Sequence, residues 1–223
     1  IVTSVHAGSF AEVDDFGGYP TDFNTPYGTL LFQNFTNALT PIPSAIINRR
    51  SFDNFNNLMI FNNATTFWTD PINFENSNTS ADIALGVEAD FIDSLDLFYI
   101  QVSAEALNDL TSTYRLLVLC VEDSIVAPQL DSEADEGIYP HKIVTDYIHS
   151  HVLRGKLNSD QSIAGDPFIS GTIPSGEWLD YKLNAEMPAN VLNKENTTIV
   201  AVIVDEITGE VIQSEETHVH VVE

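Results

Sequence analysis

Beginning at residue 82, a run of the sequence places an apolar residue at every second position, with polar or small residues between. Ile83, Leu85, Val87 and Ala89 follow this period, which is typical of a β-strand with one buried face. Further strand-like runs lie at 97–103, 114–122, 147–157, 178–184, 198–205, 210–214 and 217–222. Loops rich in Gly, Pro, Asn and Asp join these runs without the helices that parallel pairing needs. Residues 79–223 are therefore predicted to form an antiparallel, immunoglobulin-like β-sandwich.

The first part of the chain carries helical signals as well. Thr25 is a suitable helix N-cap, and Pro26 follows it at the first helical position, where proline is favoured. The predicted elements before residue 79 are strands at 1–6 and 44–48, a helix at 26–38 and an interrupted helix at 64–76. The whole chain is thus predicted to be an α+β protein.

The acidic charge shifts along the chain and suggests a domain boundary. Residues 1–78 carry seven acids and two bases, whereas residues 79–223 carry 26 acids and six bases. A length of 223 residues is sufficient for one or two domains. We therefore divide the chain into residues 1–78 and residues 79–223.

The overall charge excludes one class of function. The formal net charge is −25, and such a surface repels nucleic-acid phosphates and anionic membranes. Arg49 and Arg50 are the only adjacent basic pair, so no basic stripe exists to neutralise phosphates. Nucleic acid is therefore excluded as a partner.

Several segments together resemble the outer membrane protein twenty-eight family of Bacteroidetes-type cell envelopes. Tyr147-Ile148-His149-Ser150-His151-Val152-Leu153-Arg154 is similar to the family's Tyr-x-His-Asn-His-Val-Leu-Arg signature, with Ser150 in place of asparagine. The hairpin formed by residues 200–213 resembles the family's closing hairpin, and Ser4-Val5-His6-Ala7-Gly8 resembles an N-terminal strand end. Pro43-Ser44-Ala45-Ile46-Ile47-Asn48-Arg49 is similar to the family's Pro-x-x-x-x-Asn-Arg element.

The resemblance implies a fold and a location. The Pro43 element resembles the cis-proline strand of thioredoxin-like folds, so residues 1–78 are expected to be a thioredoxin-like segment truncated at its start, with Pro43 as the cis-proline. Family members are implied to be extracytoplasmic outer-membrane proteins, exposed at the surface or on the periplasmic side, and to act as adhesins or receptors. Membrane contact is expected only through a lipid anchor upstream of Ile1.

Two pairs of histidines give the sharpest metal hypothesis. His149 and His151 are two residues apart, as are His218 and His220, and on a strand this spacing places both imidazoles on one face. Four converging imidazoles would bind zinc or copper. Histidines at this spacing also serve as packing partners, so both interpretations stay open.

An acidic loop offers a second metal hypothesis. Asp131, Glu133, Asp135 and Glu136 precede Gly137, and carboxylates of this kind are calcium ligands. The spacing lacks the ordered ligand positions of a known calcium loop, which favours a solvated loop instead.

No motif in the chain predicts catalysis. The sequence contains neither a nucleophile elbow nor a phosphate-binding or dinucleotide-binding loop. Cys120 is the single cysteine and lies inside an apolar run, where a thiol is usually a small buried hydrophobe. The aromatic residues considered as binding anchors, if exposed, are Trp68, Tyr139, Phe168, Trp178 and Tyr181.

The expected function is non-enzymatic binding of an extracellular protein or glycan at the cell surface, without a cofactor, by sandwich loops supported on the thioredoxin-like segment. Two alternatives stay open. One is a thiol-disulfide oxidoreductase whose Cys-x-x-Cys lies upstream of Ile1, and the other is a purely structural envelope component.

Overall fold

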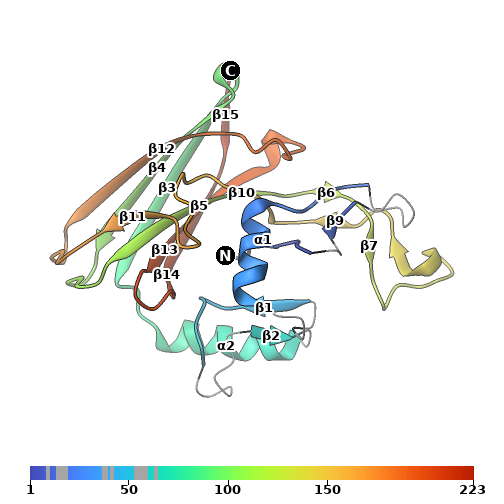
Figure 1. Ribbon diagram of the computed structural model, residues 1–223, viewed down its shortest axis with the longest axis horizontal. Helices are drawn as coiled ribbons and strands as arrows, with labels where there is room; N and C mark the ends of the chain where they lie inside the picture. The colour runs from blue at the N-terminus through green and yellow to red at the C-terminus, as the bar shows by residue number, and fades with distance from the viewer. Residues whose placement is uncertain (9–10, 14–19, 37–39, 41–42, 53–59, 63–64) are drawn as a thin grey trace.

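The protein is an α+β structure built on two packed β-sheets. The computed structural model describes residues 1–223 except 9–10, 14–19, 37–39, 41–42, 53–59 and 63–64, and excludes the side chains of 60–62 and 65–67. One sheet, the outer sheet, has the order β12-β4-β3-β15. Its strands are β3 (Ile83–Ile92), β4 (Leu97–Ala106), β12 (Trp178–Glu186) and β15 (His220–Val222). Figure 1 shows its long strands on the side of the molecule away from the β6–β9 ribbon.

The second sheet, the central sheet, has the order β10-β5-β13-β14, with β11 also paired to β5. Its strands are β5 (Tyr114–Glu122), β10 (Val152–Lys156), β11 (Asp166–Ile169), β13 (Thr197–Asp205) and β14 (Val211–His218). All pairs within this sheet are antiparallel. The two sheets confirm the predicted sandwich of antiparallel sheets, while its immunoglobulin-like character stays a prediction.

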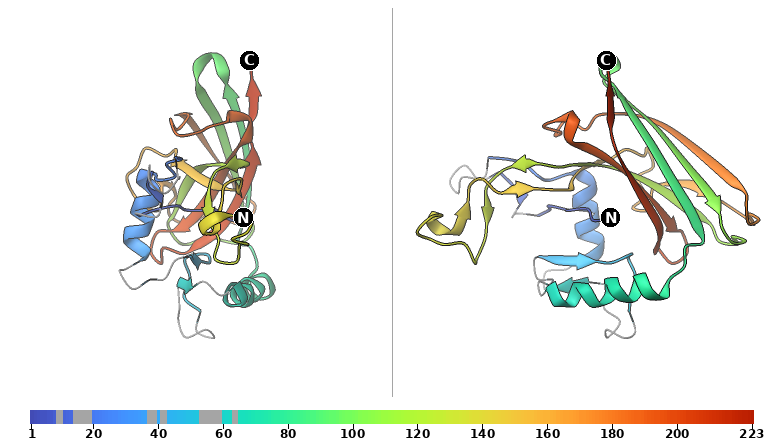
Figure 2. Two further views of the ribbon diagram at one scale, coloured as in Figure 1. Left: turned by 90° about the vertical axis from the view of Figure 1, so that its right-hand side faces the viewer. Right: turned by 180° about the vertical axis from the view of Figure 1, so that it is seen from behind.

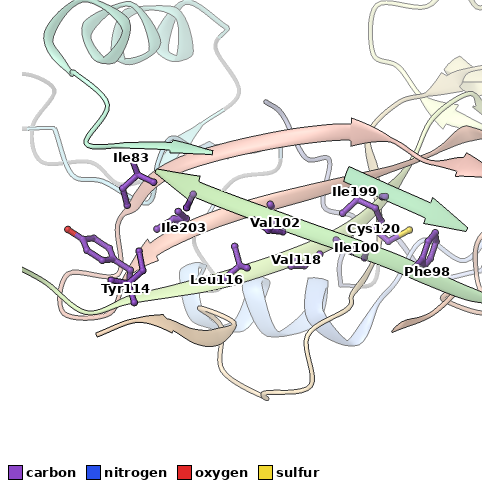
Figure 3. Close-up of a cluster of buried hydrophobic side chains, with 14 of the residues drawn as sticks. Ile83, Phe98, Ile100, Val102, Tyr114, Leu116, Val118, Cys120, Ile199 and Ile203 are labelled. Carbon is purple, nitrogen blue, oxygen red and sulfur yellow. The ribbon is translucent and has the colours of Figure 1, made fainter. Parts of the chain in front are cut away.

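The main core lies between the two sheets. Ile100 and Val102 of β4 belong to the same buried cluster as Val118 and Cys120 of β5 and Ile199 of β13, and Figure 3 shows these side chains between the strands. Inward positions alternate with exposed ones along β4, as the period of two predicts.

Strand β5 is apolar at nearly every position because both of its faces are buried. Leu116 and Val118 point into the core between the sheets, whereas Leu117 and Leu119 point to the opposite face. A strand covered on both sides has a continuous apolar run rather than an alternating one. The central sheet is therefore the middle layer of the molecule.

The helix α1 (Pro26–Phe35) covers the second face of the central sheet, and both views in Figure 2 show it beside that sheet. Tyr27 lies in one buried cluster with Leu117 and Leu153. The Thr25 side chain accepts a hydrogen bond from the backbone N–H of Gly28 at 2.9 Å, which confirms the predicted N-cap. The helix ends three residues earlier than the predicted 26–38, with Thr36 as its extended C-cap.

The remaining N-terminal elements are a short hairpin and a second helix. Strand β1 (Ser44–Ile46) pairs with β2 (Ile60–Asn62), and α2 spans Thr65–Asn78. The predicted strand at 44–48 ends early because Asn48 has a positive φ of 48°. Residue 42 lies outside the described residues, so the cis peptide at Pro43 stays a prediction. The thioredoxin-like character of residues 1–78 and the boundary near residue 79 also stay predictions.

Arginines after β1 join these elements to the sandwich. A guanidinium nitrogen of Arg49 donates to the Tyr27 hydroxyl at 3.1 Å. Arg50 pairs with Glu75 of α2 at 3.1 Å and with Glu210, next to β14, at 3.2 Å. The Asn48-Arg49 pair singled out in the sequence, together with Arg50, therefore links α1, α2 and the end of β14.

Two strand predictions are corrected. The predicted strand at 217–222 changes sheets: β14 ends at His218, Val219 is buried, and β15 then pairs with β3 in parallel. The pairing of β15 with β3 is therefore an exception to the antiparallel arrangement predicted for residues 79–223. The predicted strand at 1–6 is reduced to a single bridge between Ser4 and Val152.

A ribbon of short strands extends from the sandwich on the side opposite β12 (Figures 1 and 2). We call residues 125–149 the arm. It contains β6 (Ile125–Val126) paired with β9 (Ile148–His149), and β7 (Gln129–Leu130) paired with β8 (Ile143–Val144). The predicted strand at 147–157 is thereby divided into β9 and β10.

Candidate functional site

The signature at residues 147–154 contributes Arg154 to a buried ion pair in the central sheet. Arg154 is only 2% exposed and Glu122 only 1%. The Nε of Arg154 donates to a Glu122 carboxylate oxygen at 2.7 Å. The same carboxylate accepts from the backbone N–H groups of Leu192 and Asn193, at 3.0 and 2.6 Å. The pair therefore fastens β10, β5 and the loop before β13 together.

His149 of the same signature packs into an aromatic cluster. Its ring centroid lies 4.8 Å from those of Phe23 and Tyr147, and 5.4 Å from that of His6. Arg154 lies over the Phe23 ring at 5.8 Å. We call His6, Phe23, Tyr147, His149 and Arg154 the signature cluster. The N-terminal Ser4–Gly8 segment and the signature, which the sequence singled out separately, thus meet in space.

Burial disfavours the charged form of both histidines in the signature cluster. Burial, followed by electrostatic interaction with His149 and with Arg154, lowers the pKa of His6 to about 4. Burial also lowers the pKa of His149, against the opposing effect of the Ala127 and Pro128 backbone. The Arg154 terminal nitrogens and His149 Nε2 have no hydrogen-bond partner within the described part of the chain. The cluster is thus a packed structural contact with one permanent cation in it.

The four histidines predicted to bind zinc or copper do not come together. His151 lies between β9 and β10 with φ of 51°, so it leaves the face of His149. Its Nδ1 lies 3.2 Å from an Asp123 carboxylate oxygen. His218 ends a strand of the central sheet and His220 begins one of the outer sheet.

The separation of the four histidines has a geometric reason. A shared face requires an unbroken strand, and both His-x-His spacings are interrupted, one by the left-handed residue His151 and one by the change of sheet at Val219. Among the residues that the structure describes, no three His, Cys, Asp or Glu side chains form a group suited to a metal ion. Metal binding by these histidines stays a prediction.

The acidic loop of the arm uses its carboxylates to stabilise turns. Asp131 accepts from the backbone N–H of Glu133 at 2.9 Å, and Asp135 accepts from that of Gly137 at 2.8 Å. Asp and Asn side chains commonly bond the backbone two residues ahead in this way. The arrangement agrees with the solvated-loop interpretation rather than with calcium ligands converging on one point.

The outer face of the outer sheet carries two exposed aromatic side chains. Trp178 of β12 is 62% exposed and Tyr99 of β4 is 54% exposed. The strand pairing gives the rows on this face: Trp178-Glu105-Ala84, Asp180-Ser103-Gly86, Lys182-Gln101-Glu88 and Asn184-Tyr99-Asp90.

A shallow cleft lies in this face. Its volume is about 170 Å³, and it is lined by Glu88, Asp90, Tyr99, Ile100, Gln101 and Lys182. Asp90 also lies 3.2 Å from Nδ1 of His220, on the neighbouring strand β15. The cleft therefore combines an aromatic ring with carboxylates, an amide and one ammonium group.

The comparison with protein families decides the identity of the chain. The family model described as outer membrane protein Omp28 matches residues 33–222. The chain belongs to the Omp28 family. Among functionally curated proteins, none matches it significantly.

Two solved structures from Porphyromonas gingivalis resemble this Omp28-family chain. HBP35 has a TM-score of 0.62 at 12% identity, over 87% of this chain and 58% of the HBP35 chain, which shows a shared fold. The chain therefore spans less than two thirds of HBP35. A domain of the outer membrane lipoprotein Omp28 matches at a TM-score of 0.41 and 19% identity, over 65% of this chain and 93% of that domain.

Membership of the Omp28 family makes the chain an extracytoplasmic cell-envelope protein associated with the outer membrane. Within the described residues, no helix combines the length and apolarity needed to cross a membrane.

Sequence reasoning on this Omp28-family chain found part of the site. Trp178 was a predicted aromatic anchor and is exposed, while Tyr181 and Phe168 are partly buried and pack against the main core. Tyr99 and the cleft were missed. The available signal was the outward series 97, 99, 101 and 103 of β4, in which Tyr99 occupies a position that alternation assigns to solvent.

Proposed function

We propose that this chain is a non-catalytic binding module of the outer-membrane surface, and that it binds its partner through the outer face of the outer sheet. The observation that carries the proposal is the exposure of Trp178 and Tyr99 on one uncovered sheet face. Tryptophan and tyrosine are enriched among the residues that dominate binding energy at interfaces. A flat face with a cleft beside Tyr99 is suited to contact with a large extracellular ligand.

The proposal differs from the loop-based binding expected from sequence. The rigid pairing of β12, β4 and β3 positions the side chains of this face, with nine register pairs between β12 and β4 alone. Side chains on paired strands lose less conformational freedom on binding than side chains on loops. An adhesin or receptor role, with a lipid anchor upstream of Ile1 to tether the sandwich at the membrane, is part of the same proposal.

The thiol of this chain does not favour the redox alternative. Cys120 is fully buried, and burial, with the Glu122 carboxylate nearby, raises its pKa to about 12. A thiol must be accessible and deprotonated to exchange disulfides. A redox function would therefore depend on cysteines outside this sequence.

Binding assays with surface variants test the proposal. The purified chain is titrated with immobilised collagen, laminin, lysozyme, serum albumin and a glycan array. The face variant is Trp178→Ala with Tyr99→Ala. The matched control is Val126→Ser with Ile148→Ser, which changes two apolar side chains of the arm that are 63% and 61% exposed.

We expect at least one probe to bind and the face variant to lose about 2 kcal/mol of its binding free energy or more, as truncation of aromatic anchors does. The arm variant is expected to bind like the unmodified protein. Binding that disappears with the arm variant and survives in the face variant would assign the contact to the arm. No binding to any probe would favour the structural alternative.

A further inference from the structure

We infer that the outer face of the outer sheet recognises a basic segment of a partner protein, with a lysine or arginine side chain seated in the cleft beside Tyr99. This inference rests on the proposed function, because it names the chemistry of the ligand for the same face. It is carried by the charge of the face and by the composition of the cleft.

The charge of the face is strongly one-sided. The acidic residues on its outward positions are Glu88, Asp90, Glu105, Asp180 and Glu186, and the one lysine is Lys182. The face therefore carries four more negative than positive charges when its histidine is neutral. The chain as a whole has a net charge of −25, so the long-range field and the local field attract the same kind of partner.

The cleft has the groups that bind an organic cation. The exposed ring of Tyr99 stands among the cleft-lining residues together with the carboxylates of Glu88 and Asp90. An ammonium or guanidinium group is attracted to the face of an aromatic ring and forms charge-assisted hydrogen bonds with carboxylates. A volume of about 170 Å³ admits the end of one side chain rather than a folded domain.

Lys182 does not occupy the position of the expected cation. It pairs with Gln101, which in turn pairs with Glu88, so one strand separates Lys182 from Glu88. Adjacent strands are about 4.8 Å apart, which places the two backbones roughly 10 Å from each other. Lys182 and Glu88 thus line the cleft from strands on either side of β4.

The same charges disfavour other occupants. A second copy of the chain would bring one acidic face against another, and like charges across an interface weaken it. Phosphorylated or sulfated glycans are repelled for the same reason. A neutral glycan would use the aromatic rings but would gain nothing from the excess of carboxylates, so it is the competing outcome of the test.

The experiment separates local recognition from the general attraction between an acidic protein and a cation. Fluorescent deca-arginine and deca-lysine peptides are titrated into the chain at low and moderate salt. The site variant is Glu88→Gln with Asp90→Asn. The control variant is Glu133→Gln with Glu136→Gln, which removes the same charge from the exposed loop of the arm. A third variant, Tyr99→Leu, removes the ring and retains the charges.

We expect the site variant to bind the peptides about tenfold more weakly, Tyr99→Leu to bind them about threefold more weakly, and the control variant to change binding less than about twofold. Equal weakening in the site and control variants would overturn the inference, as would an unchanged affinity in Tyr99→Leu. A third outcome separates the inference from the proposed function. If the double variant Trp178→Ala with Tyr99→Ala no longer binds a neutral glycan or another probe, while the site and control variants bind the peptides equally well, the inference fails and the proposed function stands.

Discussion

The guanidinium Nε of Arg154 and the carboxylate of Glu122 are 2.7 Å apart, and both side chains are removed from solvent. Each is costly to bury alone, because a charge loses its hydration in the interior. Together they join neighbouring strands of the central sheet at the point where the signature segment enters it. The signature arginine is therefore a structural residue, and its loss is expected to be a stability defect.

Removal of one partner tests this role. Arg154→Met leaves the Glu122 charge buried and is expected to lower the free energy of unfolding by about 3–5 kcal/mol. Lys194→Met breaks the exposed ion pair with Asp93 and is expected to cost about 1 kcal/mol or less. Urea denaturation of both variants measures the difference. Similar losses in the two variants would contradict the structural role of Arg154.

The stability of the protein is expected to fall as the pH drops below about 6.5, the ordinary pKa of a histidine. The pKa of His6 is lowered to about 4 in the folded protein, so between these values the unfolded chain binds more protons than the folded one. The contribution of His6 to stability is then complete above about pH 6.5, the pKa of the unfolded chain. It is lost as the pH falls toward about 4, the pKa of His6 in the folded protein. The shift corresponds to up to about 3 kcal/mol.

His6→Phe is expected to flatten this part of the pH profile, measured as the midpoint of urea denaturation between about pH 4 and 7. His218→Asn, at an exposed position, is the control. Burial opposes ionisation of Asp166 and Asp205, but hydrogen bonds to their carboxylates outweigh it and lower both pKa values. These two carboxyl groups therefore change their charge below about pH 4, outside the pH range in which His6 affects stability. An unchanged slope in His6→Phe would show that other groups control this range.

Gly165 supports the loop between β10 and β11 by a close approach to the central sheet. Its φ is +89°, and a Cβ at this position would lie 2.1 Å from the carbonyl oxygen of Leu116. Gly165→Ala is expected to cost at least about 3 kcal/mol. Gly209 also has a positive φ, but a Cβ added there would meet nothing within 4 Å, so Gly209→Ala is expected to cost about 1 kcal/mol. Thermal unfolding of the two variants distinguishes a steric effect from a purely conformational one.

The separation of the four histidines argues against the metal prediction, and we expect neither zinc nor calcium to change the melting temperature. The histidines proposed as ligands lie on separate elements, and Asp131 and Asp135 are engaged in turns of the arm. A ligand that binds only the folded state raises the melting temperature, so calorimetry with each metal and with a chelator is the measurement. A zinc-dependent rise that His149→Ala abolishes would establish the site that the sequence predicted.

Cys120 is expected to be inert toward thiol reagents in the folded protein. The thiolate is the reactive form, and the pKa of this buried thiol is raised to about 12. Labelling with a disulfide reagent at neutral pH is expected to be negligible without denaturant and complete in concentrated urea. Rapid labelling of the folded chain would reveal an opening of the central sheet near β5.

Several strands of the sandwich and the start of helix α1 were predictable because their sequence signals are local. The period of two located β3 and β4, the continuous apolar run located β5, and the Thr25-Pro26 pair located the start of α1. Each of these depends on residues close together in the chain, where backbone preferences and one buried face decide the conformation.

The tertiary structure decided the features that depend on distant contacts. Only the fold shows that His6 meets His149, that β15 crosses to the outer sheet, and that Tyr99 and Trp178 share an uncovered face. The spacing of the histidines was correct for a shared face on unbroken strands, but a left-handed residue and a change of sheet separated them. Local sequence therefore determined which segments became strands, and long-range packing determined which side chains met and which stayed exposed to a partner.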